Sequence, residues 1–132
     1  SVLSDYERAP MPVVCLDIQT EMNIQPEGGE AQVMVSIQNN AEKSIILGDA
    51  MSVNPDTGAS TFFDAYSSEN VKAGTIEVLS QTNQRIIYKA EEASGMTKDS
   101  EYILYIYMMY DGEEYLLCIS QGGCYITGGN VR

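Results

Sequence analysis

The segment Tyr102–Ser120 constrains the fold more than any other part of the chain. It reads YILYIYMMYDGEEYLLCIS, two runs of strand-forming residues on either side of Asp111-Gly112. This dipeptide favours a two-residue type I′ turn, because both central residues of such a turn need a positive φ. The segment is therefore predicted to form a β-hairpin in which Tyr110 pairs with Glu113.

The turn also predicts which side chains share a face, because side chains alternate along a strand. The core face is expected to pair Leu104 with Ile119, Ile106 with Leu117 and Met108 with Tyr115. The opposite face then carries Ile103, Tyr105, Tyr107, Met109, Glu114, Leu116, Cys118 and Ser120. A lone hairpin does not bury enough apolar surface to offset the entropy of ordering its backbone. The rest of the chain must therefore supply a second layer.

Short strands separated by turn residues are predicted along the remaining sequence. Ala31–Gln38 is the clearest strand, with alternating apolar residues that are expected to point inward: Ala31, Val33, Val35 and Ile37. The other predicted strands are Val13–Gln19, Ser44–Leu47, Met51–Val53, Thr61–Phe63, Thr75–Leu79, Arg85–Lys89 and Cys124–Thr127. Asp64–Ala73 is interpreted as a loop or single helical turn, and Glu91–Ser100 as a surface connection with at most one short helix. Short strands with frequent turn signals are typical of an antiparallel sandwich or barrel.

The length of 132 residues fits a single domain. We expect residues 1–12, which include Pro10 and Pro12, to be an N-terminal tether or lead-in strand. Residues 13–127 are expected to form one β-sandwich domain, and residues 128–132 a C-terminal tail.

The composition argues against several classes of function. The net charge is −12, from 19 acidic and 7 basic residues. Such a chain has no cationic surface to neutralise nucleic-acid phosphates. It has no apolar run of membrane-spanning length, so no membrane insertion is expected. Histidine is absent, which removes imidazole catalysis and histidine metal sites. We therefore expect no enzyme activity, no catalytic residue, no metal and no cofactor.

The three cysteines are Cys15, Cys118 and Cys124, and two registers at the last turn make opposite predictions for the final pair. A three-residue loop over Ser120–Gly122 places Cys118 opposite Cys124, where a disulfide can form. A two-residue Gly122-Gly123 loop places them on opposite faces, where it cannot, and pairs Ile126 with Ile119. Both alternatives stay open on the sequence alone.

Tyr105 and Tyr107 stand two residues apart on the predicted non-core face of the hairpin, with Leu116 on the partner strand. Tyrosine suits recognition surfaces, because it combines a large contact area with a polar tip and few rotatable bonds. Ordinary cross-strand packing would explain the same residues equally well. If the chain is a binding protein, these three side chains are the predicted binding patch.

Four segments resemble immunoglobulin-like modules of Gram-positive bacterial surface proteins and lipoproteins. They are Val35–Asn40 followed by Lys43–Ile45, Val53–Gly58, Val71–Thr75 and Tyr102–Ile106, and the similarity spans about Val13–Ser120. The B–F disulfide and the buried tryptophan of antibody domains are missing. The resemblance implies an all-β, antiparallel immunoglobulin-like sandwich of seven to nine strands. It also implies a non-catalytic accessory or binding module that is extracellular or on the bacterial cell surface.

Three functions are compatible with these observations. The first is an extracellular module that recognises a protein or glycan, or that spaces a larger surface protein, as a monomer or as part of a longer chain. The second is a small acidic inhibitor or immunity-type protein that binds a basic partner, for which the charge would speed association. The third is a viral or pilus structural subunit that assembles through an edge strand.

Overall fold

A computed structural model of the chain describes residues 16–24, 30–91, 102–120 and 123–128. Their regular structure consists of strands, and no helix occurs among them. The strands are β1 (Leu16–Ile24), β2 (Ala31–Asn39), β3 (Ile45–Val53), β4 (Ser60–Tyr66), β5 (Ile76–Val78), β6 (Thr82–Ala90), β7 (Ile103–Tyr110), β8 (Glu113–Ser120) and β9 (Gly123–Gly128). All paired strands are antiparallel. The predicted all-β antiparallel fold is therefore confirmed.

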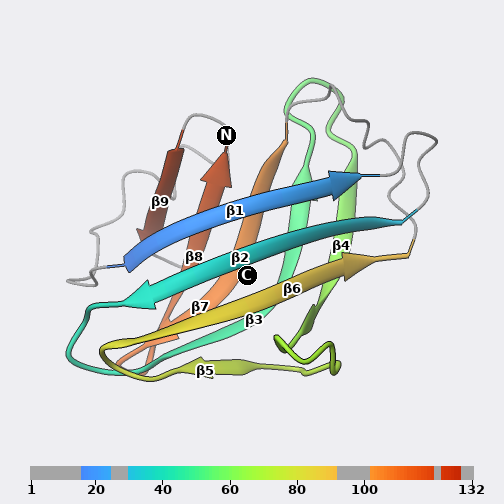
Figure 1. The fold of residues 1–132 in the computed structure, drawn as a ribbon. Helices are drawn as coiled ribbons and strands as arrows, with labels where there is room; N and C mark the ends of the chain where they lie inside the picture. The colour runs from blue at the N-terminus through green and yellow to red at the C-terminus, as the bar shows by residue number, and fades with distance from the viewer. Residues whose placement is uncertain (1–15, 25–29, 92–101, 121–122, 129–132) are drawn as a thin grey trace.

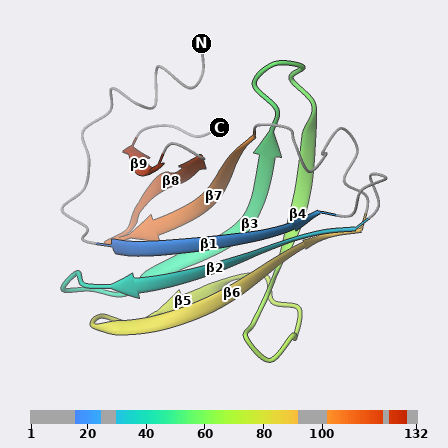
Figure 2. The same ribbon diagram turned by 45° about the horizontal axis from the view of Figure 1, so that its top comes forward.

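The strands form one sheet that curls into two facing layers. Their order is β1-β2-β6-β4-β3-β7-β8-β9, and β5 pairs with β3 beside this path. Strands β1, β2 and β6 make one layer, which crosses over the strands β3, β7 and β8 of the other (Figure 1). The tilted view shows strands β3, β7 and β8 on one side of the β1–β2–β6 layer (Figure 2). Every described strand belongs to this sheet. Residues 1–12, predicted as a tether, and residues 129–132 of the predicted tail lie outside the described residues, whereas Gly128, predicted as the first residue of the tail, ends β9.

Strand β4 joins the layers by changing partner. Residues 60–63 pair with β3, and residues 64–66 pair with β6. A β-bulge in β3 between Leu47 and Ala50 lies at this corner. The Asp49 carboxylate accepts a hydrogen bond from the Ala65 backbone N–H at 3.1 Å, and the Tyr88 hydroxyl donates to the Gly48 carbonyl at 3.0 Å. The bulge therefore holds both layers where the sheet bends.

The predicted hairpin is confirmed in its turn and in its register. Asp111 and Gly112 have φ values of 52° and 78°, the positive values that a type I′ turn requires. The register pairs Leu104 with Ile119, Ile106 with Leu117 and Met108 with Tyr115, as predicted. The alternation of the two runs and the turn dipeptide thus suffice to define strands β7 and β8.

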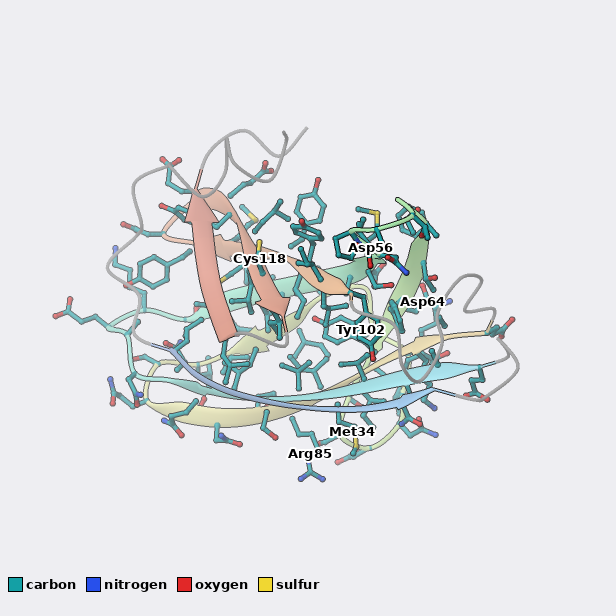
Figure 3. All side chains as sticks on the ribbon, turned by 90° about the horizontal axis from the view of Figure 1, so that it is seen from above. Met34, Asp56, Asp64, Arg85, Tyr102 and Cys118 are labelled. Carbon is teal, nitrogen blue, oxygen red and sulfur yellow. The ribbon has the colours of Figure 1, made fainter. Side chains whose placement is uncertain are left out.

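The core lies between the two layers. The four inward residues predicted in β2 are fully buried, and so is the aliphatic face of the hairpin around Leu104, Ile106 and Leu117. Tyr102, which precedes β7, also lies between the layers (Figure 3). Met34 and Arg85 project from the outer face of the β1–β2–β6 layer, away from the core. The largest fully buried side chains are Tyr88 and Phe63.

Several predicted boundaries were wrong, each because a strand continues where its apolar pattern is interrupted. Ser44–Leu47, apart from Ser44, and Met51–Val53 belong to the single strand β3, which the bulge interrupts. Asp64–Tyr66, predicted as a loop, is the part of β4 that pairs with β6. β1 runs on to Ile24 because it pairs with β2 along its whole length. β6 starts at Thr82 instead of Arg85 for the same reason. Cys15, Val13 and the segment 92–100 lie outside the described residues.

We expect Tyr88→Phe to lower the free energy of unfolding at pH 7 by about 1 kcal/mol, the contribution of one hydrogen bond. The difference in free energy of unfolding between the wild type and the variant should shrink above pH 10. Burial, reinforced by the nearby Asp49 carboxylate, raises the pKa of Tyr88 above its ordinary value of 10.0. At higher pH the unfolded phenol loses its proton while the folded one keeps it. This group then removes up to about 1.4 kcal/mol of stability per pH unit.

Urea unfolding of both proteins between pH 7 and pH 11 measures this effect. The Tyr88→Phe variant has no proton to lose at this position, so its stability should fall less steeply, and the two curves should converge and cross. Tyr102, whose pKa burial also raises, is present in both proteins and cancels. A constant difference across the range would contradict the buried, protonated phenol.

Candidate functional site

The three predicted binding residues share the outer face of the β3–β7–β8 layer. Tyr105 and Tyr107 lie on β7, and Leu116 on β8 is the cross-strand partner of Tyr107. Tyr107 is 47% exposed, whereas Tyr105 and Leu116 are half-buried. The prediction that these side chains project away from the core is therefore correct, and Tyr107 is the most accessible of the three.

The structure extends this patch across two further strands that the sequence analysis did not include. Met51 on β3 pairs with Tyr105 on one side and with Phe62 of β4 on the other. Ile46 on β3 pairs with Met109 on β7. Cross-strand partners project from the same face of a sheet. We call the resulting set the apolar face: Ile46, Met51, Phe62, Tyr105, Tyr107, Met109 and Leu116.

The apolar face is most open over β3, β4 and β7. Phe62 is 75% exposed, Met109 42% and Ile46 36%. Cys118 on β8 is the cross-strand partner of Tyr105, yet it is fully buried. Large apolar side chains are seldom gathered on a solvated sheet face, and such gatherings mark interaction sites more often than isolated exposed residues do.

The bulge shapes the centre of the apolar face. Residues Gly48 and Asp49 together stand opposite Tyr107, between the paired positions at Leu47 and Ala50. A Cβ added at Gly48 would lie 3.3 Å from the Cβ of Tyr107. Glycine therefore lets the Tyr107 side chain stand close against the β3 backbone.

Carboxylates border the apolar face. Glu77 of β5 pairs with Ile46, and Glu114 of β8 pairs with Met109, so this row has an acid at each end. Asp64 follows two residues after Phe62 on the same side of β4, whereas Asp49 lies in the bulge opposite Tyr107, at the centre of the face. We call Glu77, Glu114 and Asp64 the acidic rim. Two lysines reach this region, Lys72 at 3.5 Å from Asp64 and Lys43 at 2.6 Å from Asp111 in the hairpin turn. The Asp111 carboxylate raises the pKa of Lys43 through this contact.

Neither predicted register at the last turn is correct. The connection from β8 to β9 uses Gln121 and Gly122, and it pairs Ser120 with Gly123. Ile119 pairs with Cys124, and Cys118 pairs with Tyr125. The disulfide between Cys118 and Cys124 therefore lacks the cross-strand pairing on which it was predicted. Cys118 is buried, and its sulfur lies 4.0 Å from the Leu116 carbonyl oxygen.

No group of three or more side chains that could hold a metal ion occurs in the described part of the chain. In the Asn54–Gly58 turn the Asn54 side chain accepts hydrogen bonds from the backbone N–H groups of Asp56 at 2.9 Å and Thr57 at 3.3 Å. Its oxygen thus closes an Asx turn. Within the described ranges no helix is long and apolar enough to cross a membrane.

Comparisons with known proteins give only distant likenesses. No family model and no curated protein matches the chain. An X-ray structure of a structural genomics target is 11% identical with a TM-score of 0.42, over 92% of this chain and 85% of that one. A Bordetella pertussis protein provisionally assigned as ApaA is 7% identical with a TM-score of 0.35, over 91% of this chain and 93% of that one. At these TM-scores and identities, neither likeness carries an assignment of fold family or function.

Proposed function

We propose that the chain is a non-catalytic binding module that recognises a protein partner through the apolar face. The observation that carries this proposal is the gathering of Phe62, Tyr107, Met109 and Ile46, all exposed, on one face of the sheet. Aromatic residues and methionine are enriched in protein interfaces and among the residues that dominate binding energy. In this proposal the module is an immunoglobulin-like sandwich that works outside the bacterial cell or on its surface.

A protein partner suits the apolar face better than a glycan does. Glycan sites combine an aromatic platform with polar groups that bind sugar hydroxyls. Here the exposed apolar side chains include Met109 and Ile46, which offer no hydrogen-bonding group to a sugar, and the carboxylates of Asp64 and Glu77 lie at the border of the face. A surface of phenyl, thioether and aliphatic groups is complementary to another apolar protein surface.

A second candidate, the acidic inhibitor or immunity-type protein, is favoured by the net charge of −12 and by the acidic rim. Both candidates use the same face. They differ in the nature of the partner, which is a basic enzyme or toxin in the second case.

Photo-crosslinking tests the proposed face. A photoreactive residue is placed at Phe62 in one protein and at Leu79 in another, and both are expressed in the cells that naturally make the chain. Leu79 is a matched control, because it is 56% exposed but lies in the loop after β5. We expect position 62 to give an adduct with one other protein that position 79 does not give. Equal adducts at both positions, or adducts only between copies of the chain, would contradict the proposal.

We expect Phe62→Ser to weaken binding of that crosslinked partner about thirtyfold, since loss of an aromatic anchor in an interface costs about 2 kcal/mol. Leu79→Ser should change the affinity less than twofold. Titration calorimetry with the purified partner measures both values. Thermal unfolding of each variant supplies the folding control, because substitutions at exposed positions change stability little. Equal losses of affinity in the two variants would place the binding surface elsewhere.

A further inference from the structure

We propose that Met109 is a modification site, at which oxidation by a peroxide to the sulfoxide switches off binding through the apolar face. This inference rests on the proposed function and adds a means of regulating the same face. Its basis is the position of Met109 on β7, where its side chain is 42% exposed among the apolar groups that a partner would cover. Oxidation turns methionine from an apolar side chain into a polar one, and methionine sulfoxide reductases reverse the change.

The sheet places two neighbouring methionines of β7 in opposite environments. Met108 points into the core and is 1% exposed, whereas Met109 lies on the outer face. Side chains alternate along a strand, so the register that buries one thioether exposes the other. A buried thioether meets a dissolved oxidant only when its strand opens, and opening a core strand costs close to the whole free energy of unfolding. We therefore expect oxidation to begin at Met109 and to spare Met108.

The other described sulfur atoms on this side of the layer are better shielded. Met51 is half-buried and lies in the cross-strand row between Tyr105 and Phe62. Cys118 is fully buried on β8. The oxidation of sulfur-containing side chains follows their exposure. Of the described sulfur atoms on this side of the layer, that of Met109 is therefore the first that a peroxide reaches.

The modification needs an oxidant and no catalytic group of the protein. Hydrogen peroxide transfers one oxygen atom to the thioether sulfur of Met109. The O–O bond breaks, an S–O bond forms, and water leaves. The sulfur is oxidised by two electrons, and the peroxide is reduced by the same two electrons.

The sulfoxide opposes binding of an apolar partner. Met109 and its cross-strand partner Ile46 offer no strong hydrogen-bonding group, so a partner that fits this part of the face is apolar there. A sulfoxide oxygen that is covered by such a partner loses its bound water without a replacement. This loss corresponds to a weakening of the affinity by about tenfold to a hundredfold. Because Met109 lies outside the core, the oxidised protein should remain folded.

Limited treatment of the full-length chain with hydrogen peroxide, followed by tandem mass spectrometry of its peptides, tests the modification site. We expect the sulfoxide of Met109 to form at least about tenfold faster than that of Met108, because only the latter requires opening of the core. Fragments that break between the two residues distinguish them. Equal rates, or faster oxidation of Met108, would overturn the inference.

Titration calorimetry with the partner that position 62 captures then measures the effect on binding, and each protein is compared with itself before and after the same treatment. We expect oxidation to weaken binding by the wild type about tenfold or more, and methionine sulfoxide reductases to restore it. Met109→Leu keeps an apolar side chain of similar volume without sulfur, so treatment should change its affinity less than about twofold.

Met34→Leu is the matched control. Met34 is half-buried on the outer face of the β1–β2–β6 layer, away from the apolar face (Figure 3). Treatment should therefore weaken binding by this variant as much as binding by the wild type. Equal losses in the Met109→Leu protein and the wild type would place the sensitive group elsewhere. Loss of the circular dichroism of the folded sheet in the oxidised wild type would make the effect structural and would equally overturn the inference.

The outcomes separate this inference from the proposed function. A partner that is captured at position 62 and binds the oxidised and untreated proteins equally well would leave the binding face in place and would remove the switch. Failure of position 62 to capture any partner would remove the face itself, and the switch with it.

Discussion

Replacing Ile45 with alanine lowers the free energy of unfolding by about 2–5 kcal/mol, whereas the same replacement at Ile46 costs about 1 kcal/mol or less. The two isoleucines are neighbours on β3 and differ in the face on which they lie. Ile45 is fully buried in the core and pairs with Val78 on one side and Tyr110 on the other. Ile46 is 36% exposed on the apolar face. A cavity therefore forms only at the first position.

Urea unfolding of the two variants measures both free energies, and an unchanged m-value shows that the comparison is two-state in each case. The identical chemistry of the substitutions makes each variant the control for the other. A one-residue slip of β3 would exchange the two faces and reverse the order of the losses. Equal losses would mean that Ile46 is covered, and would count against an exposed apolar face.

The sequence was sufficient for the hairpin because all its determinants are local. Asp111-Gly112 specifies the turn, and the turn then sets every pair from Tyr110–Glu113 outward. The strand Ala31–Asn39 could also be predicted from sequence, since apolar and polar residues alternate along a strand with one buried face. In both segments neighbouring residues carry the whole signal.

The corner of the sheet could not be predicted, because its determinants are distant in sequence. Gly48-Asp49 breaks the alternation of β3, and its role as a bulge depends on Tyr107 and on Ala65. Asp64–Tyr66 has a weak strand pattern of its own and is ordered by pairing with β6. The prediction of the turn between β8 and β9 was wrong for a different reason. Glycines at positions 122 and 123 allow several short loops, and the choice among them depends on pairing with β8.

The candidate site was predictable in part for the same reason. Tyr105, Tyr107 and Leu116 follow from the hairpin register alone. Phe62 and Ile46 complete the apolar face only through the pairing of β3 with β4 and β7, which no local pattern contains. The alternation of Thr61, Phe62 and Phe63 does predict that the two phenylalanines face opposite ways. It leaves open which of them is buried.

Asn39 should be the most sensitive polar position, and Asn39→Ala is expected to lower the free energy of unfolding by about 2–4 kcal/mol. Its side chain is fully buried at the end of β2. The amide nitrogen donates to the carbonyls of Lys43 and Val78, both at 3.0 Å, and the amide oxygen accepts from the Ala41 N–H at 2.9 Å. Alanine removes all three bonds and leaves the Val78 carbonyl without this donor.

Asn39→Asp should cost more than Asn39→Ala at pH 7, because it places a charged oxygen where the amide nitrogen faced two carbonyl oxygens. This environment should raise the pKa of the new carboxyl group in the folded protein above its unfolded value of about 3.9. The penalty is therefore present above that pH and shrinks as the pH falls toward it, when the protonated group can donate one hydrogen bond. Urea unfolding at pH 7 and pH 4.5 measures both variants, with Asn83→Ala at an exposed position of β6 as the control. If Asn39→Ala costs no more than Asn83→Ala, the side chain does not tie the β2–β3 connection to β5, and the start of β3 must be held by its strand partners alone.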